Sequence, residues 1–147
     1  MQNASAARVK TYLFACVHNA GRSQMAAALF NVYVDKNQCR AVSAGTQPAD
    51  HVHPEVVESM RELGIDLTSC RPQKLSLELL QGASVLVTMG CGEACPFVPG
   101  LRTIDWMLPD PKGQSLETVR AIRNAIQERV TALIRSDCAE CCLAEYR

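Results

Sequence analysis

The sequence lacks both a long apolar run and a surplus of charge of either sign. None of its apolar stretches approaches the roughly 20 residues that a membrane-spanning helix needs, so we expect no membrane span. The 15 basic and 15 acidic residues cancel, so composition gives no reason to expect a nucleic acid or an anionic membrane as partner. Attraction for an anionic ligand therefore has to come from a local arrangement of charges.

The first ten residues also lack the apolar core of a signal peptide, although the chain has eight cysteines. In a chain without such a signal, thiols are more often reduced, with catalytic, redox or metal-binding roles, than paired in structural disulfides. We therefore predict a cytoplasmic protein, and a monomer. Its 147 residues are expected to form a single domain, with an ordered core at about 9–135 and a flexible, cysteine-containing tail at 136–147.

Strand-like and helix-like segments alternate along the chain. Strands are expected at 10–15, 40–43, 85–89 and 102–106, and helices at 22–34, 54–63, 74–80 and 116–134. The apolar run at 85–89 is typical of a central parallel strand that is covered on both faces. This alternation predicts an α/β fold, a doubly wound, four-stranded parallel sheet flanked by helices. The turns that follow its strands would meet at one edge, where such folds bind ligands.

Apolar stripes mark the expected helices, including the two longest, at 22–34 and 116–134. In the first helix the predicted buried face consists of Met25, Leu29, Val32 and Tyr33. In the last helix it consists of Val119, Ile122, Ile126, Val130 and Leu133, and Ser115 is the expected N-cap.

Residues 16–23, Cys-Val-His-Asn-Ala-Gly-Arg-Ser, join the first expected strand to the first expected helix, and we call them the anion loop. A cysteine at the start of such a turn faces loop N–H groups and the positive end of the helix dipole, which both favour a thiolate. The same N–H groups can cradle a tetrahedral oxyanion, and Arg22 can bind two of its oxygens. Ser23 can donate its hydroxyl to the Cys16 sulfur, and Asn19 suits a left-handed turn position. We therefore predict Cys16 as a nucleophile beside an oxyanion site formed by Val17, His18, Asn19, Ala20, Gly21, Arg22 and Ser23.

Two further candidates follow later strands. Asp110 precedes a proline that fixes its turn, so its carboxyl group can donate a proton to a leaving oxygen, or it can simply cap the next helix or meet solvent. Asp105, within or beside the fourth strand, is a weaker rival. Cys91 and Cys95 lie in a segment rich in glycine and proline, where they can act as a redox pair or remain two reduced thiols.

Other cysteine and histidine groupings carry weaker signals. The tail cysteines Cys138, Cys141 and Cys142 have no neighbouring histidine to complete a metal site, so a redox shuttle, a metal scavenger and a disordered tail all stay open. His51 and His53 precede a proline in a loop and are interpreted as solvated or structural. We predict no metal site.

The pattern Cys16-x5-Arg22-Ser23 at the first strand-to-helix turn resembles the anion loop of the low-molecular-weight protein tyrosine phosphatase family. The continuation Arg22-Ser23-Gln24-Met25-Ala26 is more similar to its arsenate reductase branch, because the phosphatases usually have proline where Gln24 stands. Three later stretches look like the same branch: 43–46, 87–91 and 105–111. The resemblance extends from about residue 10 to residue 134.

The resemblance implies the roles of the candidate residues. Asp110 would be the general acid, as the aspartate before proline is in this family. The Cys16 thiolate would form a covalent adduct with arsenate, a second cysteine would release arsenite, and a third would take over the disulfide, with Cys91 and Cys95 in these two places. No bound cofactor is implied. The reductant would be thioredoxin, or a small thiol such as mycothiol or glutathione with a glutaredoxin-like protein, because Cys91 and Cys95 stand closer together than in thioredoxin-linked relatives.

Two departures from the family matter. Gly21 stands where relatives often have a second cysteine, so no disulfide can form within the anion loop. Ala27 replaces the glutamate of reductases that bind potassium, so we do not predict that ion. The function that follows is arsenate reduction; the alternative is a protein tyrosine or aryl phosphatase that uses Cys16, Arg22 and Asp110. A third class, a non-catalytic oxyanion sensor, would need neither the thiolate nor the acid.

Overall fold

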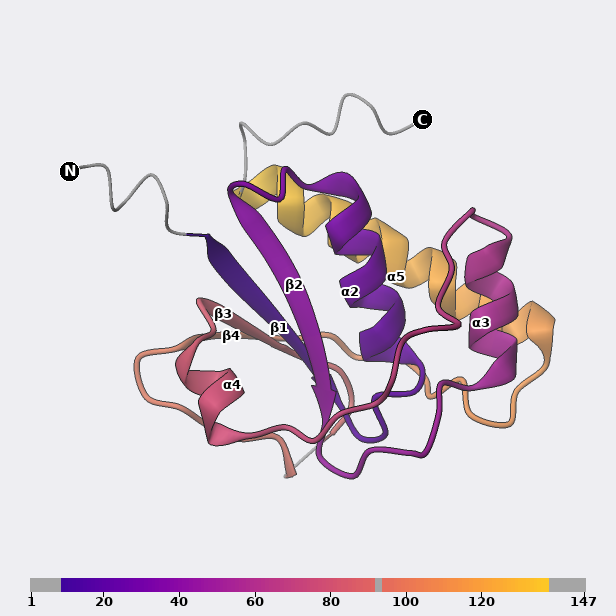
Figure 1. Ribbon diagram of the computed structural model, residues 1–147, viewed down its shortest axis with the longest axis horizontal. Helices are drawn as coiled ribbons and strands as arrows, with labels where there is room; N and C mark the ends of the chain where they lie inside the picture. The colour runs from indigo at the N-terminus through magenta and orange to yellow at the C-terminus, as the bar shows by residue number, and fades with distance from the viewer. Residues whose placement is uncertain (1–8, 92–93, 138–147) are drawn as a thin grey trace.

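The computed structural model describes residues 9–91 and 94–137 of the chain. Its strands are β1 (Lys10–Cys16), β2 (Cys39–Gly45), β3 (Val85–Thr88) and β4 (Arg102–Asp105), and its helices are α2 (Arg22–Tyr33), α3 (Pro54–Arg61), α4 (Leu77–Gln81) and α5 (Leu116–Asp137). Each lies where the sequence predicted it, within a few residues at the ends (Figure 1). None of the helices in the described part is long and apolar enough to cross a membrane. The cysteines of the expected tail lie outside the described residues.

All four strands are parallel, in the order β2-β1-β3-β4. The chain leaves β1 toward one side, to β2, and later returns to the other side, to β3. The carboxyl ends of β1 and β3 therefore flank the point where the winding changes direction, and open α/β sheets bind ligands at this point. Cys16 ends β1, and Gly90 and Cys91 follow β3, so the topology brings the first two predicted cysteines to this point.

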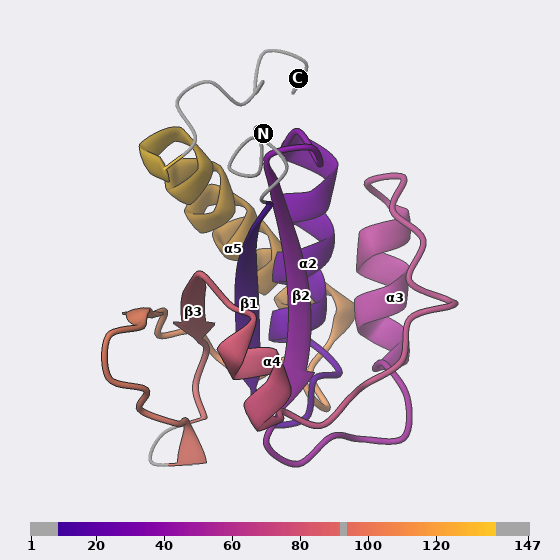
Figure 2. The same ribbon diagram turned by 60° about the vertical axis from the view of Figure 1, so that its left-hand side comes forward.

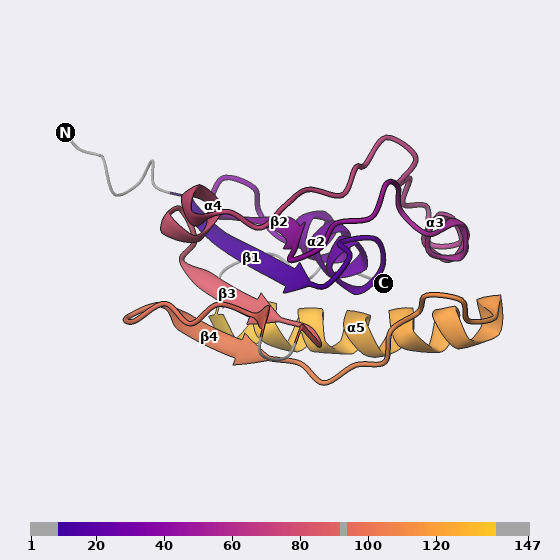
Figure 3. The same ribbon diagram turned by 90° about the horizontal axis from the view of Figure 1, so that it is seen from below.

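The two faces of the sheet are covered unequally. Tyr12, Phe14, Val85 and Val87 point into the larger core, which α2, α3 and α5 complete. Leu13, Ala15 and Leu86 point the other way, into a smaller core that includes Leu80 of α4. Figure 3 shows the sheet with α4 on one side and α2 and α5 on the other. The doubly wound prediction is confirmed, and β3, fully buried on both faces, is the central strand that its apolar run predicted.

The two apolar stripes had different outcomes. In α5 all five predicted residues are buried, and Ser115 Oγ accepts a hydrogen bond of 3.2 Å from the Thr118 N–H, as expected of an N-cap. In α2 the prediction was partly wrong, because Val32 is exposed while Ala26, Ala27 and Phe30 are buried. Helix α2 packs against the sheet on one side and against α5 on another, so its first two turns are covered on nearly every side. A one-sided stripe cannot describe such a helix.

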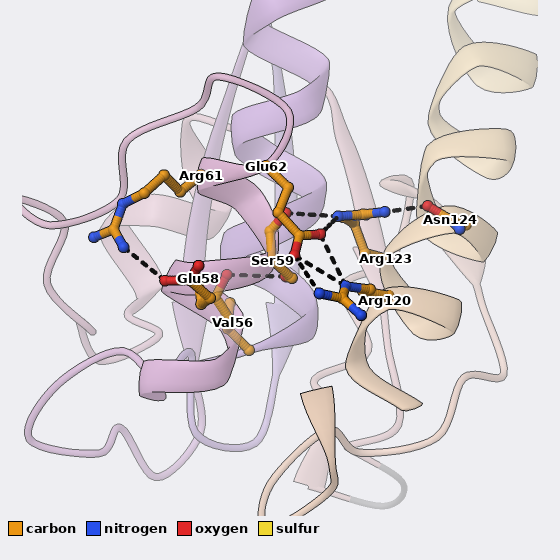
Figure 4. A network of polar contacts seen from close by, with 8 residues as sticks. All are labelled: Val56, Glu58, Ser59, Arg61, Glu62, Arg120, Arg123 and Asn124. Carbon is orange, nitrogen blue, oxygen red and sulfur yellow. Dashed lines mark hydrogen bonds and ion pairs between the residues drawn. The ribbon is translucent and has the colours of Figure 1, made fainter. Parts of the chain in front are cut away.

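Helix α3 lies beyond α2, away from the sheet (Figure 1, Figure 2), and packs against α5. A polar network joins the two helices (Figure 4). The Glu62 carboxylate accepts hydrogen bonds from Arg120 Nη2 at 2.6 Å and from Arg123 Nη1 at 2.9 Å. Arg123 Nη1 also donates to the Ser59 carbonyl at 2.6 Å. These charge-assisted bonds hold the C-terminal end of α3 on α5.

Candidate active site

The anion loop begins at the buried end of β1 and stops where α2 starts. Asn19 adopts the left-handed conformation with φ 50°, as its residue type suggested. Its side-chain Nδ2 donates to Ser23 Oγ at 2.7 Å, and Ser23 Oγ lies 2.9 Å from Cys16 Sγ. Because Asn19 is the donor to the Ser23 oxygen, the Ser23 hydroxyl hydrogen is available to the sulfur. The three side chains therefore form a buried chain of hydrogen bonds that suits a thiolate at Cys16.

Asn19 is in turn held by residues that sequence reasoning did not assign to the site. Gln24 Nε2 donates to the Asn19 carbonyl at 3.0 Å and lies 3.3 Å from both Asn19 Oδ1 and the Arg71 carbonyl. The Gln73 N–H donates to Asn19 Oδ1 at 2.9 Å. The only sequence signal was that Gln24 replaces a proline, which could not make these contacts. Gln24 thus ties the loop to the segment that precedes α4.

The carbonyl groups of the anion loop face the segment between β2 and α3. Those of Cys16, Val17, His18 and Ala20 accept hydrogen bonds from the N–H groups of Thr46, Gln47, Ala49 and His53, at 2.8 to 3.1 Å. The N–H groups of residues 17–23, in contrast, donate to no other described residue. With carbonyls turned outward and amides unpaired, the loop has the electrostatics of an anion cradle.

Arg22 is almost fully buried, with 6% of its side chain exposed. Its Nη1 donates to the Leu108 carbonyl at 3.1 Å, and its Nη2 lies 3.7 Å from Asp110 Oδ2. Among the described residues, Nε is buried without a hydrogen-bond partner. A buried N–H without a partner is costly, and an oxyanion bound in the loop would supply one. Gly90, with φ 87°, permits this arrangement, because a Cβ at that position would overlap the guanidinium.

The Asp110-Pro111 turn lies directly over the anion loop. A Cβ on Gly21 would come within 2.6 Å of Pro111 Cγ, so the glycine is what lets the turn approach. The Asp110 side chain is 42% exposed, and its Oδ1 accepts a hydrogen bond of 3.0 Å from the Lys112 N–H. The carboxylate is thus near the guanidinium and still open to solvent. Asp105, the weaker candidate, is instead bound by Thr88 Oγ1 at 2.7 Å.

Cys91 and Cys95 form a disulfide, with their Cα atoms 5.2 Å apart. Cys91 is buried and directly follows Gly90, the residue that contacts Arg22. The predicted redox pair therefore adjoins the Arg22 guanidinium. Cys16 and Cys70 form no disulfide bond with another described residue.

His53 lies beside Gly21 of the anion loop, close enough to Asp110 and His18 to be affected by their charges. Burial lowers the pKa of His53, while the nearby Asp110 opposes this shift and His18 and Lys112 add to it. His51 is exposed, whereas His53 is partly buried beside the anion loop, where its N–H donates to the Ala20 carbonyl.

A four-stranded parallel sheet with a cysteine loop at its first turn is the fold of the low-molecular-weight tyrosine phosphatases. The family model described as low molecular weight phosphotyrosine protein phosphatase matches residues 11–141, and the chain belongs to this family. It is 41% identical over 124 residues to a putative arsenate reductase of Halobacterium salinarum, covering 82% of this chain and 87% of that one. It is 33% identical over 129 residues to a glutaredoxin arsenate reductase of Synechocystis, covering 86% and 97%.

Among solved structures, a thioredoxin-dependent arsenate reductase from Corynebacterium glutamicum superposes with a TM-score of 0.77 at 37% identity. The alignment covers 89% of this chain. It spans 63% of the longer chain of that protein.

Proposed function

We propose that this protein is an arsenate reductase in which Cys16 is the nucleophile and Cys91 and Cys95 carry the relay. The observation that carries this proposal is the disulfide between Cys91 and Cys95 beside the anion loop. A phosphatase needs no second and third cysteine, whereas a reductase needs thiols that take up the oxidising equivalents of its substrate. The arsenate reductases among the relatives support the same function.

The anion loop and Arg22 bind arsenate. The unpaired N–H groups of residues 17–23 and the free Arg22 Nε are donors for its oxygens, and Asn19 and Ser23 orient the Cys16 sulfur. The Cys16 thiolate attacks arsenic, and one arsenate oxygen leaves as water after protonation, for which Asp110 is the acid. Arsenic is still pentavalent in this adduct.

The Cys91 thiolate then attacks Cys16 Sγ. The S–As bond breaks, its electron pair stays on arsenic, and arsenite leaves, so that arsenic is reduced by two electrons while a Cys16–Cys91 disulfide forms. Cys95 next attacks Cys91, which releases the Cys16 thiolate and leaves the Cys91–Cys95 disulfide. An external thiol reductant supplies two electrons and two protons to restore both thiols. One relative is named a thioredoxin-dependent arsenate reductase and another a glutaredoxin arsenate reductase, which supports thioredoxin and a glutaredoxin-type protein as candidate reductants.

The first experiment measures arsenate-dependent NADPH oxidation with thioredoxin and its reductase, and in parallel with a small thiol and a glutaredoxin. We expect turnover with thioredoxin and, by mass spectrometry after a single turnover, a Cys91–Cys95 disulfide. Turnover with the small thiol alone, without that disulfide, would refute the relay while keeping Cys16. The cytoplasmic location and the monomeric state stay predictions.

A second candidate is the aryl phosphatase reaction, which the exposed Asp110 carboxylate near Arg22 favours. An acid in that place could protonate the leaving oxygen of a phosphate ester. An aryl phosphate assay on the same preparation tests this function. Clear hydrolysis without any arsenate-linked oxidation would assign the protein to the phosphatase branch.

A further inference from the structure

Exposed apolar side chains gather around the disulfide. Five large apolar residues of the described chain are exposed, and the three with the largest exposed fractions are Phe97 at 84%, Met107 at 76% and Leu77 at 69%. Phe97 is two residues from Cys95, and Met107 and Leu77 border hollows on either side of the segment that contains it. The other two, Val32 and Leu63, lie on α2 and after α3.

Successive residues of the segment 94–96 line two different surface hollows. Ala94 and Pro96 line a hollow of 320 Å³ together with Leu77 and Leu80 of α4. Cys95 lines a second hollow of 370 Å³ together with Met107, Asp105 and Gly90. Cys95 is half-buried while its partner Cys91 is buried, so the accessible end of the disulfide lies between the two hollows.

The chemistry of this surface favours a protein partner over a free small thiol. Of the described residues that line the two hollows, Lys74 is the only cation, and its Nζ already donates to the Thr46 carbonyl at 3.1 Å. An anionic tripeptide thiol would find little to bind its carboxylates here. Exposed aromatic and aliphatic side chains with hollows between them are instead typical of protein interfaces, in which a few such anchors supply most of the binding energy.

We propose that Leu77, Phe97 and Met107 form a docking face for a dithiol protein of the thioredoxin class that reduces the Cys91–Cys95 disulfide. This inference rests on the proposed function, because that function makes this disulfide the product of each turnover. The apolar anchors seat the partner over Cys95. None of the three belongs to the residues proposed to bind the oxyanion.

The test uses the full chain, oxidised beforehand so that the Cys91–Cys95 bond is present, and needs no arsenate. Reduction of this bond by a bacterial thioredoxin with its reductase and NADPH is compared with reduction by dithiothreitol. We expect Phe97→Ala to lower kcat/KM for thioredoxin about tenfold and Met107→Ala to lower it about threefold, as truncated interface anchors do. Phe97→Leu, which keeps an apolar anchor, should restore most of the loss.

Val32→Ala is the matched control, because it truncates an exposed apolar residue on α2. It should leave both rates unchanged, and the dithiothreitol rate should be the same within about twofold in every variant, since a small reagent needs no docking face. Equal thioredoxin rates for wild type and Phe97→Ala would overturn the proposal. A second result would also overturn it. If Phe97→Ala self-associates less than wild type on a sizing column but is reduced by thioredoxin at the same rate, the face binds a second copy of this chain instead.

Failure of the proposed function gives a different result. A wild-type protein that shows no arsenate turnover with dithiothreitol is not an arsenate reductase, whatever thioredoxin does to its disulfide. A protein that turns over arsenate with dithiothreitol, but whose disulfide thioredoxin does not reduce, keeps its function and loses the docking face.

Discussion

The anion loop and the segment around Cys95 differ in almost every physical respect, although Gly90 places them next to each other. The loop is largely buried, and its side chains and carbonyl groups are hydrogen-bonded to one another, to Gln24 of α2, to Gln73 and to the segment 46–53. Residues 95–97 are half-buried to exposed, and Phe97 is the most exposed large apolar residue described.

This difference follows from the two proposed tasks. Binding a tetrahedral anion requires donors fixed in advance, because any movement on binding lowers affinity. Passing a disulfide to another protein requires a sulfur that a large partner can reach. A chain that does both needs a rigid site and an accessible one side by side. The following predictions test this division, in order of decreasing expected effect.

Replacing the nucleophile should have the largest effect. Cys16→Ser is expected to abolish arsenate turnover, by about a thousandfold or more, because a hydroxyl at this position is a far weaker nucleophile. Thermal unfolding should change little, since serine is nearly isosteric. Steady-state kinetics with dithiothreitol provide the measurement. Cys70→Ser, at a half-buried free cysteine, is the control and should retain activity; retained activity in Cys16→Ser would exclude the assignment.

The role of the accessible segment around Cys95 is tested most directly by replacing Cys95 itself. Cys95→Ser should stop the relay after its second step, so that a Cys16–Cys91 disulfide accumulates after one turnover with arsenate. Peptide mapping by mass spectrometry detects that bond. Turnover with thioredoxin should fall about a hundredfold or more, because the resolving thiol is missing. A variant that cycles at the wild-type rate would show that Cys95 takes no part.

Anion binding by the rigid loop can be tested by replacing the buried guanidinium of Arg22. Arg22→Lys keeps the positive charge but removes Nε, the donor that has no partner among the described residues. Phosphate, a substrate-like anion, should bind about 10- to 100-fold more weakly, which corresponds to the roughly 1.5–3 kcal/mol of a hydrogen bond to a charged group. Isothermal titration calorimetry measures this affinity. Unchanged binding would place the anion elsewhere.

Gln24 tests whether the rigidity of the loop matters for function. Gln24→Ala removes three contacts from the Asn19 and Arg71 oxygens, and phosphate affinity should fall about threefold to tenfold as Asn19 loses its support. Asn31→Ala is a matched control, because the Asn31 amide makes a comparable pair of bonds with the Ala41 backbone, away from the loop. Both variants should unfold more easily, but Asn31→Ala should keep its affinity. Equal phosphate binding by Gln24→Ala and wild type would leave Gln24 a structural residue only.

The smallest effect is expected from a change in the polar network between α3 and α5. This network belongs neither to the anion loop nor to the segment around Cys95. Hydrogen bonds from Arg120 and then Arg123 lower the pKa of Glu62. A carboxylate whose pKa is lower in the folded than in the unfolded protein stabilises the fold above about pH 4.5, its value without partners, and this stabilisation is lost as the pH falls through the lower, folded value.

Glu62→Gln should therefore melt slightly below wild type at pH 7, and the gap should narrow toward pH 3. Differential scanning calorimetry at several pH values measures both. Arsenate turnover should be unchanged, which would confirm that the network supports the fold alone. A gap that widens at low pH would contradict the assigned role of Glu62.

Much of the fold and the site could be predicted from local sequence patterns. Alternating strands and helices predicted the sheet, and the residues from Cys16 to Ser23 predicted the loop, because turn chemistry and helix starts depend on near neighbours in the chain. The α2 stripe was partly wrong because contacts with the sheet and α5 bury that helix on more than one side. Local patterns could not predict the contacts that Gly90, Leu108 and Gln73 make with the loop, since each contact joins residues far apart in the chain.

The sequence by itself thus determined the element order, the position of the anion loop and the candidates for the reactive groups. Only the tertiary structure decided that Gly90 adjoins Arg22, that the Asp110 turn covers Gly21, and that three exposed apolar side chains surround the segment of Cys95. The physical reason is that parallel strands gather turns from distant parts of the chain at one edge, and local patterns carry no record of which side chains meet there.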